Sequence, residues 1–334
     1  MTAVPKVAPR PDRAGEPPRS EGPLSEPVGP GRRPSGSGRR RSARRRLAPY
    51  VFLAPAFVLF AIVLLVPIAK ATQVSFYDWL PFPGAENTFV GLENYTRAFG
   101  DPLFRMSVVN AVVYMLVTVP GQIVLGLGVA LLLQNRLPGR AVFRVLFYLP
   151  VVTSWVVVSL LFRYLFATDG GLINWFLVEG LGVMEEPVGW LDSRWTAMTA
   201  LCVLGIWKGI GWTAVILLAG LTGVPKELHE AAAVDGAGYA RRTWHVTLPA
   251  LRRTLLFVSV MLVIGSFNVF ISVLLMTRGG PAGETEVPLS YAYRETFNFL
   301  EFGYGSAVAV IMTLVVLVLS IGQTLLANRA ERGE

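Results

Sequence analysis

The chain has 334 residues, of which 53% are hydrophobic and only 16% are charged. This composition argues for a protein that folds in a lipid bilayer and against an ordinary soluble domain. The formal net charge of +8 comes from the first 46 residues, because acidic and basic side chains are equal in number in the rest of the chain. A basic excess that lies in one tail, and not on a folded face, argues against nucleic-acid binding.

Residues 1–46 form a tail that is rich in Pro, Gly and Arg. Twelve Lys and Arg, nine Pro and six Gly residues leave it without apolar periodicity, so it buries too little surface to offset the entropy of ordering. We expect this tail to be disordered. Six arginines between residues 39 and 46 directly precede the first apolar segment, and the positive-inside rule places such a flank in the cytoplasm. Residues 47–329 then form the membrane domain.

Six apolar segments are long enough to cross a hydrocarbon core about 30 Å thick, for which a helix needs about 20 residues. They cover residues 48–70, 107–134, 142–166, 197–220, 252–276 and 304–326. Basic residues dominate the loops after the second and fourth segments, whereas acidic residues dominate the other three loops. We therefore predict an all-α integral membrane protein with six transmembrane helices and both termini in the cytoplasm.

The sequence lacks residues that several functional classes of membrane protein need. The six segments contain no Asp or Glu, although proton- and sodium-coupled carriers depend on buried carboxylates. The sequence has no phosphate-binding loop of the form G-x-x-x-x-G-K-[ST], so another subunit must bind any ATP that drives the protein. Two His and one Cys give no metal-ligand pattern and no activated nucleophile. A secondary carrier or channel and a membrane-embedded enzyme are thus the weaker alternatives, and we expect no cofactor.

Lys208 is the one charged residue near the middle of a predicted span. It lies in a run that also contains Gly205, Gly209 and Trp212. An unpaired cation at that depth costs roughly 2.5–3.5 kcal/mol, so its ammonium group should face a water-filled cavity or bind carbonyl groups at a helix interface. The sequence leaves both possibilities open, because the glycines suit close helix packing as well as space for a ligand.

The cytoplasmic loop between the fourth and fifth segments contains a short helix of its own. Pro225 suits a first helical position, acidic residues follow in the first turn, alanines fill the middle and Gly236 supplies the stop. About ten residues cannot span a bilayer. This helix should therefore lie along the cytoplasmic face, where its small alanine side chains let a partner dock closely.

The residues around this helix resemble the EAA motif of the permease subunits of binding-protein-dependent ABC importers. The matching residues are Glu230, Ala231, Ala232, Asp235, Gly236, Ala237, Leu248 and Pro249. The resemblance to the carbohydrate branch, the maltose and glycerol-phosphate type permeases, runs from about residue 47 to residue 328. One position departs from the pattern, because the family usually has an aromatic residue where this chain has Thr243, with Trp244 next to it. This affects the packing of the loop and not its identity.

The resemblance implies a permease subunit that forms the path for a sugar or sugar-like solute across a bacterial inner membrane. The short helix would be a coupling helix in a groove of the ATPase, with Glu230 as a charged contact, Ala231 and Ala232 closely packed, and Gly236 at the turn. The implied partners are a second, homologous permease, two ATP-binding-cassette ATPase subunits that bind the ATP, and an extracytoplasmic solute-binding protein. The sequence does not identify the sugar.

In such permeases the substrate path lies between the spans that flank the coupling loop. The matching positions here are Gly205, Gly209, Trp212, Ser266, Asn268 and Val269. An aromatic face together with amide and hydroxyl groups suits a sugar, which presents apolar CH faces and many hydroxyl groups. Ordinary helix packing is the alternative explanation for each of these residues. With Lys208, which can face either the cavity or an interface, the predicted path has seven positions.

Overall fold

A computed structural model of the chain describes residues 49, 50, 52–82, 84, 86–135 and 138–332. The chain divides into two units, Met1–Phe60 and Ala61–Glu334. In the first unit, residues 52–60 are helical. The predictions for the basic tail, residues 1–46, lie outside the described residues.

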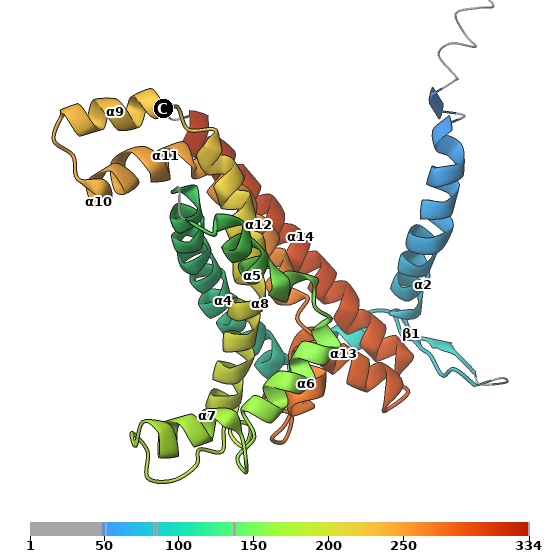
Figure 1. Ribbon diagram of the computed structural model, residues 1–334. Coiled ribbons are helices and arrows are strands. Elements are labelled where there is room, and N and C mark those ends of the chain that lie inside the picture. Colours follow the sequence, from blue (N-terminus) through green and yellow to red (C-terminus); the bar gives the residue numbers. More distant parts are fainter. Residues whose placement is uncertain (1–48, 51, 83, 85, 136–137, 333–334) are drawn as a thin grey trace, which may run out of the picture. The chain divides into compact units, whose positions relative to one another are not determined.

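The second unit is mostly helical, as Figure 1 shows. Its first half contains a π-helical turn η1 (Ala61–Leu65), α2 (Val66–Val74), the antiparallel pair β1 (Tyr77–Asp78) and β2 (Thr88–Phe89), α3 (Glu93–Gly100), α4 (Pro102–Gln134), α5 (Arg140–Val152), α6 (Trp155–Leu165), α7 (Leu172–Trp175) and η2 (Phe176–Gly180). Its second half contains α8 (Arg194–Thr222), α9 (Lys226–Val234), α10 (Tyr239–Arg242), η3 (Thr243–Thr247), α11 (Leu248–Ala250), α12 (Arg252–Phe267), η4 (Val273–Thr277), α13 (Pro288–Phe297) and α14 (Phe302–Arg332).

The described residues include four single helices that are long and apolar enough to cross a membrane. These are Phe52–Val74, Pro102–Gln134, Arg194–Thr222 and Phe302–Leu325. Two bent pairs, Arg140–Val152 with Trp155–Leu165 and Tyr239–Ala250 with Arg252–Phe267, raise the number to six when each pair counts as one span. The predicted all-α fold with six spans is therefore confirmed.

The third expected span, residues 142–166, is not one straight helix. The axes of α5 and α6 differ by 96°. At the break, Lys208 Nζ donates hydrogen bonds of 2.8 Å to the carbonyl oxygens of both Pro150 and Thr153, and Thr153 Oγ1 donates one of 2.6 Å to Pro150. These side-chain bonds satisfy carbonyl groups that have no intrahelical partner where α5 ends, and so they stabilise the turn between α5 and α6.

The fifth expected span, residues 252–276, is also interrupted. Helix α12 ends at Phe267, and irregular backbone at residues 268–270 separates it from the short helix that contains η4. The Asn268 side-chain amide donates a 2.9 Å hydrogen bond to the Ile264 carbonyl. Such local side-chain bonds satisfy the last carbonyl groups of a helix and favour its end at this position.

Helices α4 and α8 form the centre of the second unit. They pack against each other along much of their lengths, and α5 and α12 also contact them. The most apolar part of α8 is 56% buried, whereas that of Phe302–Leu325 is 28% buried, so α8 is the more interior span. Close approach of α4 and α8 depends on Gly126, because a Cβ there would press on the Thr213 side chain and the Ala214 amide of α8.

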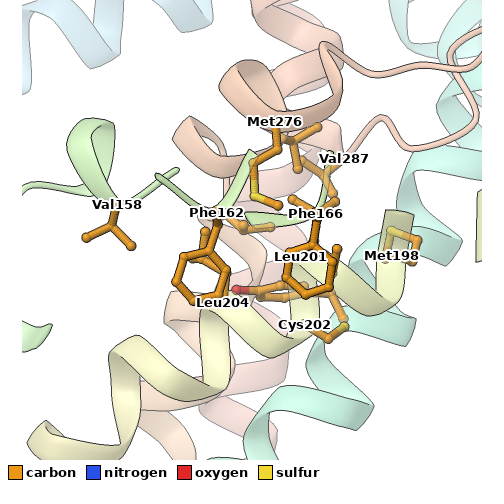
Figure 2. Packing of buried hydrophobic residues seen from close by; sticks show 13 residues of the cluster. Val158, Phe162, Phe166, Met198, Leu201, Cys202, Leu204, Met276 and Val287 are labelled. Carbon is orange, nitrogen blue, oxygen red and sulfur yellow. The ribbon is translucent and has the colours of Figure 1, made fainter. Parts of the chain in front are cut away.

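One apolar cluster joins the end of α6 to α8 and to the loop before α13. Figure 2 shows the aromatic rings of Phe162 and Phe166 against Leu201 and Leu204 of α8, with Met276 and Val287 on the other side. The phenylalanine rings lie 6.2 Å apart. In a bilayer, close van der Waals packing of such side chains, and not their removal from water, holds α6 against α8 despite the break that precedes it.

A hydrogen-bonded aspartate fixes the start of α4. Asp101 is the N-cap of this helix, and its carboxylate accepts hydrogen bonds from the Leu103 amide at 2.8 Å and from the hydroxyl groups of Tyr291 and Tyr304 at 2.5 and 3.1 Å. Burial raises the pKa of Asp101, but these hydrogen bonds outweigh burial and hold the pKa below its usual value. The charged carboxylate thus ties α4 to α13 and α14.

Candidate functional site

A cavity of about 260 Å³ lies among α4, α5, α6, α8 and α12. The side chains and glycines that line it are Tyr114, Gln122, Val151, Trp155, Gly205, Lys208, Gly209, Trp212, Met261, Leu262, Gly265 and Ser266. A second cavity of about 300 Å³ shares Tyr114, Trp155 and Gly265 with the first and extends along the irregular backbone after α12. Its other lining residues are Asn268, Val269, Phe270, Ile271 and Ser272. The two cavities are close to the size of ordinary small-ligand pockets.

All seven residues that the sequence suggested for the path line one of these two cavities. Gly205, Lys208, Gly209, Trp212 and Ser266 line the first cavity, and Asn268 and Val269 line the second. Residues from α8 and from the end of α12 are thus brought together, although the coupling loop separates them in the sequence. Ser266 also donates a 2.7 Å hydrogen bond to the Leu262 carbonyl of its own helix, so its hydroxyl group is already partnered.

Lys208 faces a cavity and also binds carbonyl groups at a helix interface, the two positions that the sequence left open. Its side chain is 5% exposed, and its ammonium group binds the two carbonyl oxygens at the break between α5 and α6. The Nζ atom also lies 4.8 Å from the centre of the Trp155 ring, a distance at which the cation interacts with the face of the indole. Since Lys208 and Trp155 both line the first cavity, the residue that caps the broken helix is also part of the cavity wall.

Tyr114 and Gln122 of α4 and Trp155 of α6 are cavity residues that the sequence reasoning missed. A signal for the first two was present, because polar side chains inside an apolar span often face a cavity or a partner. Eight residues separate Tyr114 from Gln122, which places them on one face of a helix with 3.6 residues per turn. Trp155 gave no such signal, because an aromatic side chain in the middle of an apolar segment is expected whether it faces lipid, another helix or a cavity.

The predicted coupling helix is present as α9. It begins at Lys226 and not at Pro225, which is instead the residue before the helix. Its end forms a Schellman motif, in which the amides of Gly236 and Ala237 donate hydrogen bonds of 3.1 and 2.9 Å to the carbonyls of Ala233 and Ala232. Gly236 has a φ angle of 77°, a left-handed conformation that favours glycine. The glycine signal in the sequence thus identified the helix end correctly.

Helix α9 has no buried residue. Glu230, Ala231, Asp235, Gly236 and Pro249 are exposed, and Ala232, Ala237 and Leu248 are partly buried. Large apolar side chains are also exposed in α9 and the segment that follows it, among them Leu228, Val234, Tyr239 and Trp244. In Figure 1, α9, α10 and α11 lie beyond the ends of α4 and α8, at the opposite end from α7. An exposed apolar surface of this kind is typical of a docking site.

The same segment is firmly attached to the membrane helices at its end. Leu251 is 1% exposed and belongs to an apolar cluster with Leu217 and Leu221 of α8 and Val258 of α12. A force on α9 would therefore reach α8 and α12 through buried side chains. These are the helices that contribute most of the residues around the first cavity.

In the part of the chain that the structure describes, no group of three or more His, Cys, Asp or Glu side chains could hold a metal ion. The only described charged residue of the first cavity is Lys208.

Comparison with known proteins gives one consistent result. Residues 122–332 match the family described as "Binding-protein-dependent transport system inner membrane component". The probable ABC transporter permease protein YurN of Bacillus subtilis is 33% identical over 282 residues, which are 84% of this chain and 96% of that protein. The sulfoquinovosyl glycerol transport system permease protein SmoG of Agrobacterium fabrum is 36% identical over 80% of this chain and 86% of that protein.

A solved structure has the same fold. It is the crystal structure of a bacterial alginate ABC transporter in complex with an alginate pentasaccharide-bound periplasmic protein. One of its chains aligns with a TM-score of 0.76 over 87% of this chain and 97% of its own length, at 20% sequence identity.

Proposed function

The chain belongs to the family of inner membrane components of binding-protein-dependent transport systems, and we propose that it forms the path by which a sugar or sugar-like solute enters a bacterial cell. As a member of this family, it is a multi-pass membrane permease subunit and not an ATPase. The carbohydrate assignment rests on two observations. A relative is named for sulfoquinovosyl glycerol transport, and the cavity chemistry suits a sugar.

The observation that carries this proposal is the pair of adjoining cavities beside the predicted path residues. Trp155 and Trp212 offer aromatic faces, on which the CH faces of a sugar can stack. Gln122, Asn268 and the third N–H of Lys208 offer hydrogen-bonding groups for its hydroxyls. A small number of polar groups in a mainly apolar cavity is the usual composition of a small-ligand site.

Energy for transport would enter through α9. In this proposal α9 docks on one of two ATP-binding-cassette subunits, which bind the ATP, and an extracytoplasmic binding protein delivers the solute to this chain and a second permease. Closure of the ATPase subunits moves α9, and Leu251 passes that movement to α8 and α12. The cavity between α8 and α12 then opens alternately to either side of the membrane.

The proposed orientation follows from loop charges. Reporter domains fused after Arg140 and after Arg241 should report a cytoplasmic location, and one fused after Glu185 should report an external location. A reporter after Arg241 that is external would place α9 on the wrong side for an ATPase and would contradict the proposal.

The direct test of function is uptake by proteoliposomes that hold the full complex. We expect uptake of a radiolabelled sugar only when ATP is present with the ATPase subunits, and no uptake from a proton or sodium gradient alone. Uptake that follows an ion gradient and ignores ATP would instead indicate a secondary carrier.

A further inference from the structure

Two polar side chains of α4 are exceptions to the hydrogen-bonding pattern of that helix. Among the described residues, no hydrogen-bond partner is present for the side chains of Tyr114 and Gln122, which are 5% and 8% exposed. The other buried polar residues of α4 are partnered. Thr118 donates to the Tyr114 carbonyl at 2.7 Å, and Asn110 donates to two carbonyls of the loop before α13. A polar group without a protein partner is satisfied only by water or by a ligand, so these two side chains call for an explanation.

Both side chains line the first cavity, and two glycines of α8 make their positions possible. A Cβ at Gly205 would overlap the Tyr114 hydroxyl group, and a Cβ at Gly209 would overlap the Gln122 carboxamide. The two glycines are one helical turn apart on α8. Because neither glycine has a side chain, the Tyr114 hydroxyl and the Gln122 carboxamide can lie against the backbone of α8 at the edge of the cavity.

Lys208 supplies a third polar group to the same cavity. An ammonium group has three N–H donors, and two of those of Lys208 bind the carbonyls of Pro150 and Thr153. The remaining donor, the Tyr114 hydroxyl and the Gln122 carboxamide together offer donors and acceptors, while Trp155 and Trp212 offer aromatic faces. Among the described residues that line this cavity none is acidic, which disfavours a cationic solute next to Lys208.

We infer that Tyr114 and Gln122 bind the solute directly during its passage, through hydrogen bonds to hydroxyl groups of a polyhydroxylated solute that carries no positive charge. The inference deepens the proposed function and rests on it for the identity of the solute. It adds α4 as a third wall of the path, next to α8 and α12. It also assigns to Gly205 and Gly209 the role of leaving space for those two polar side chains, where the sequence alone suggested only helix packing or room for a ligand.

A labelling experiment tests whether these positions face a water-filled path, and it does not depend on which solute is carried. In a Cys202→Ala background, Gln122→Cys and Val124→Cys are compared in the full complex with a small hydrophilic methanethiosulfonate during ATP hydrolysis. Val124 is on the same helix, is 66% exposed and lines neither cavity, so it lies outside the proposed path. We expect the cysteine at position 122 to react at least about tenfold faster, because thiolates form only in contact with water. Equal, slow rates at both positions would overturn the inference.

An uptake experiment tests direct contact with the solute. The probe is whichever of lactose, arabinotriose and sulfoquinovosyl glycerol the wild-type complex takes up fastest, because relatives of this chain are named for the transport of lactose, arabinooligosaccharides and sulfoquinovosyl glycerol. Tyr114→Phe and Gln122→Leu should each lower ATP-driven uptake by about two- to tenfold, the effect of one lost hydrogen bond. Assembly of the complex and its ATPase rate without solute should stay at the wild-type level. If the two side chains had only a structural role, both quantities would fall. The control Thr118→Val, at a buried position outside the cavities, should transport normally.

The two experiments separate the failure of this inference from the failure of the proposed function. If the wild-type complex takes up none of the three sugars but the cysteine at position 122 reacts rapidly, the sugar assignment is wrong and the exposure of Gln122 to the path is upheld. If wild-type uptake is driven by ATP and both Tyr114→Phe and Gln122→Leu transport at the wild-type rate, the inference is wrong and the proposed function stands.

Discussion

Replacement of Lys208 by methionine should destabilise the folded permease, even though it removes a charge from the membrane. The ammonium group makes two hydrogen bonds of 2.8 Å to the carbonyls at the break between α5 and α6. Hydrogen bonds to charged groups contribute about 1.5–3 kcal/mol each. Removal of a cation from the centre of a span recovers roughly 2.5–3.5 kcal/mol. At the middle of these ranges the two bonds, about 4.5 kcal/mol together, exceed that gain of about 3 kcal/mol, so we expect a net loss of about 1.5 kcal/mol.

The assay is thermal unfolding of the purified permease in detergent, with Lys70→Met as the matched control. Lys70 also lies in an apolar span, but it is exposed and its ammonium makes only a 3.3 Å hydrogen bond to Gln73. Lys208→Met should lower the melting temperature, and Lys70→Met should leave it nearly unchanged. Insertion into the membrane should be intact for both variants. If Lys208→Met unfolds at or above the wild-type temperature, the account of the helix break is wrong.

Two further predictions concern helix packing and pH. Gly211→Ala should lower the melting temperature, because its Cβ would overlap the backbone carbonyl of Phe147 and overpacking of a close contact costs about 1–3 kcal/mol. Gly265→Ala should leave stability unchanged, since a Cβ there meets no atom within 4 Å, but it should slow uptake because Gly265 lines both cavities. Equal effects of the two variants on stability would contradict this distinction. The pKa of Asp101 is lowered in the folded protein, so its ionised form stabilises the fold above the usual pKa of 3.8. This contribution is lost as the pH falls through the lower pKa of the folded state. Melting temperatures measured from about pH 5 to pH 3 should therefore fall more in the wild type than in Asp101→Asn, which already lacks the charge, and parallel curves would rule out this role.

Local signals in the sequence predicted several elements well. Gly236 marked the end of α9 because a left-handed residue at that position favours glycine. The length of each apolar segment predicted the spans, since a bilayer of fixed thickness requires a fixed helix length. The start of α9 was wrong by one residue, because Pro225 is compatible with the position before a helix as well as with its first turn.

Other features depend on residues that are distant in the sequence. At the break in the third span, Lys208 binds the Pro150 carbonyl, which is 58 positions before it in the sequence. The apolar pattern of residues 142–166 does not record that contact, so a continuous helix was the natural prediction. Tyr114 and Gln122 were missed for a similar reason. Two polar side chains on one face of an apolar helix were a local signal, but their place in the cavity also depends on space that Gly205 and Gly209 provide on another helix.

The central claim is that ATP-driven movement enters the permease through α9. The most direct test is co-purification of the ATPase subunits in detergent, together with uptake measured in the same cells. Ala232→Trp adds bulk at the small side chain that the proposal places against the ATPase, Glu230→Lys reverses an exposed charge, and Gly236→Val places a β-branched residue at a φ of 77°. We expect each variant to insert normally, to retain less ATPase and to lose uptake, whereas Glu185→Lys, in a different exposed loop, should behave as the wild type. Full ATPase retention together with full uptake in all three α9 variants would show that α9 is an ordinary connector between α8 and α12, and would contradict the account.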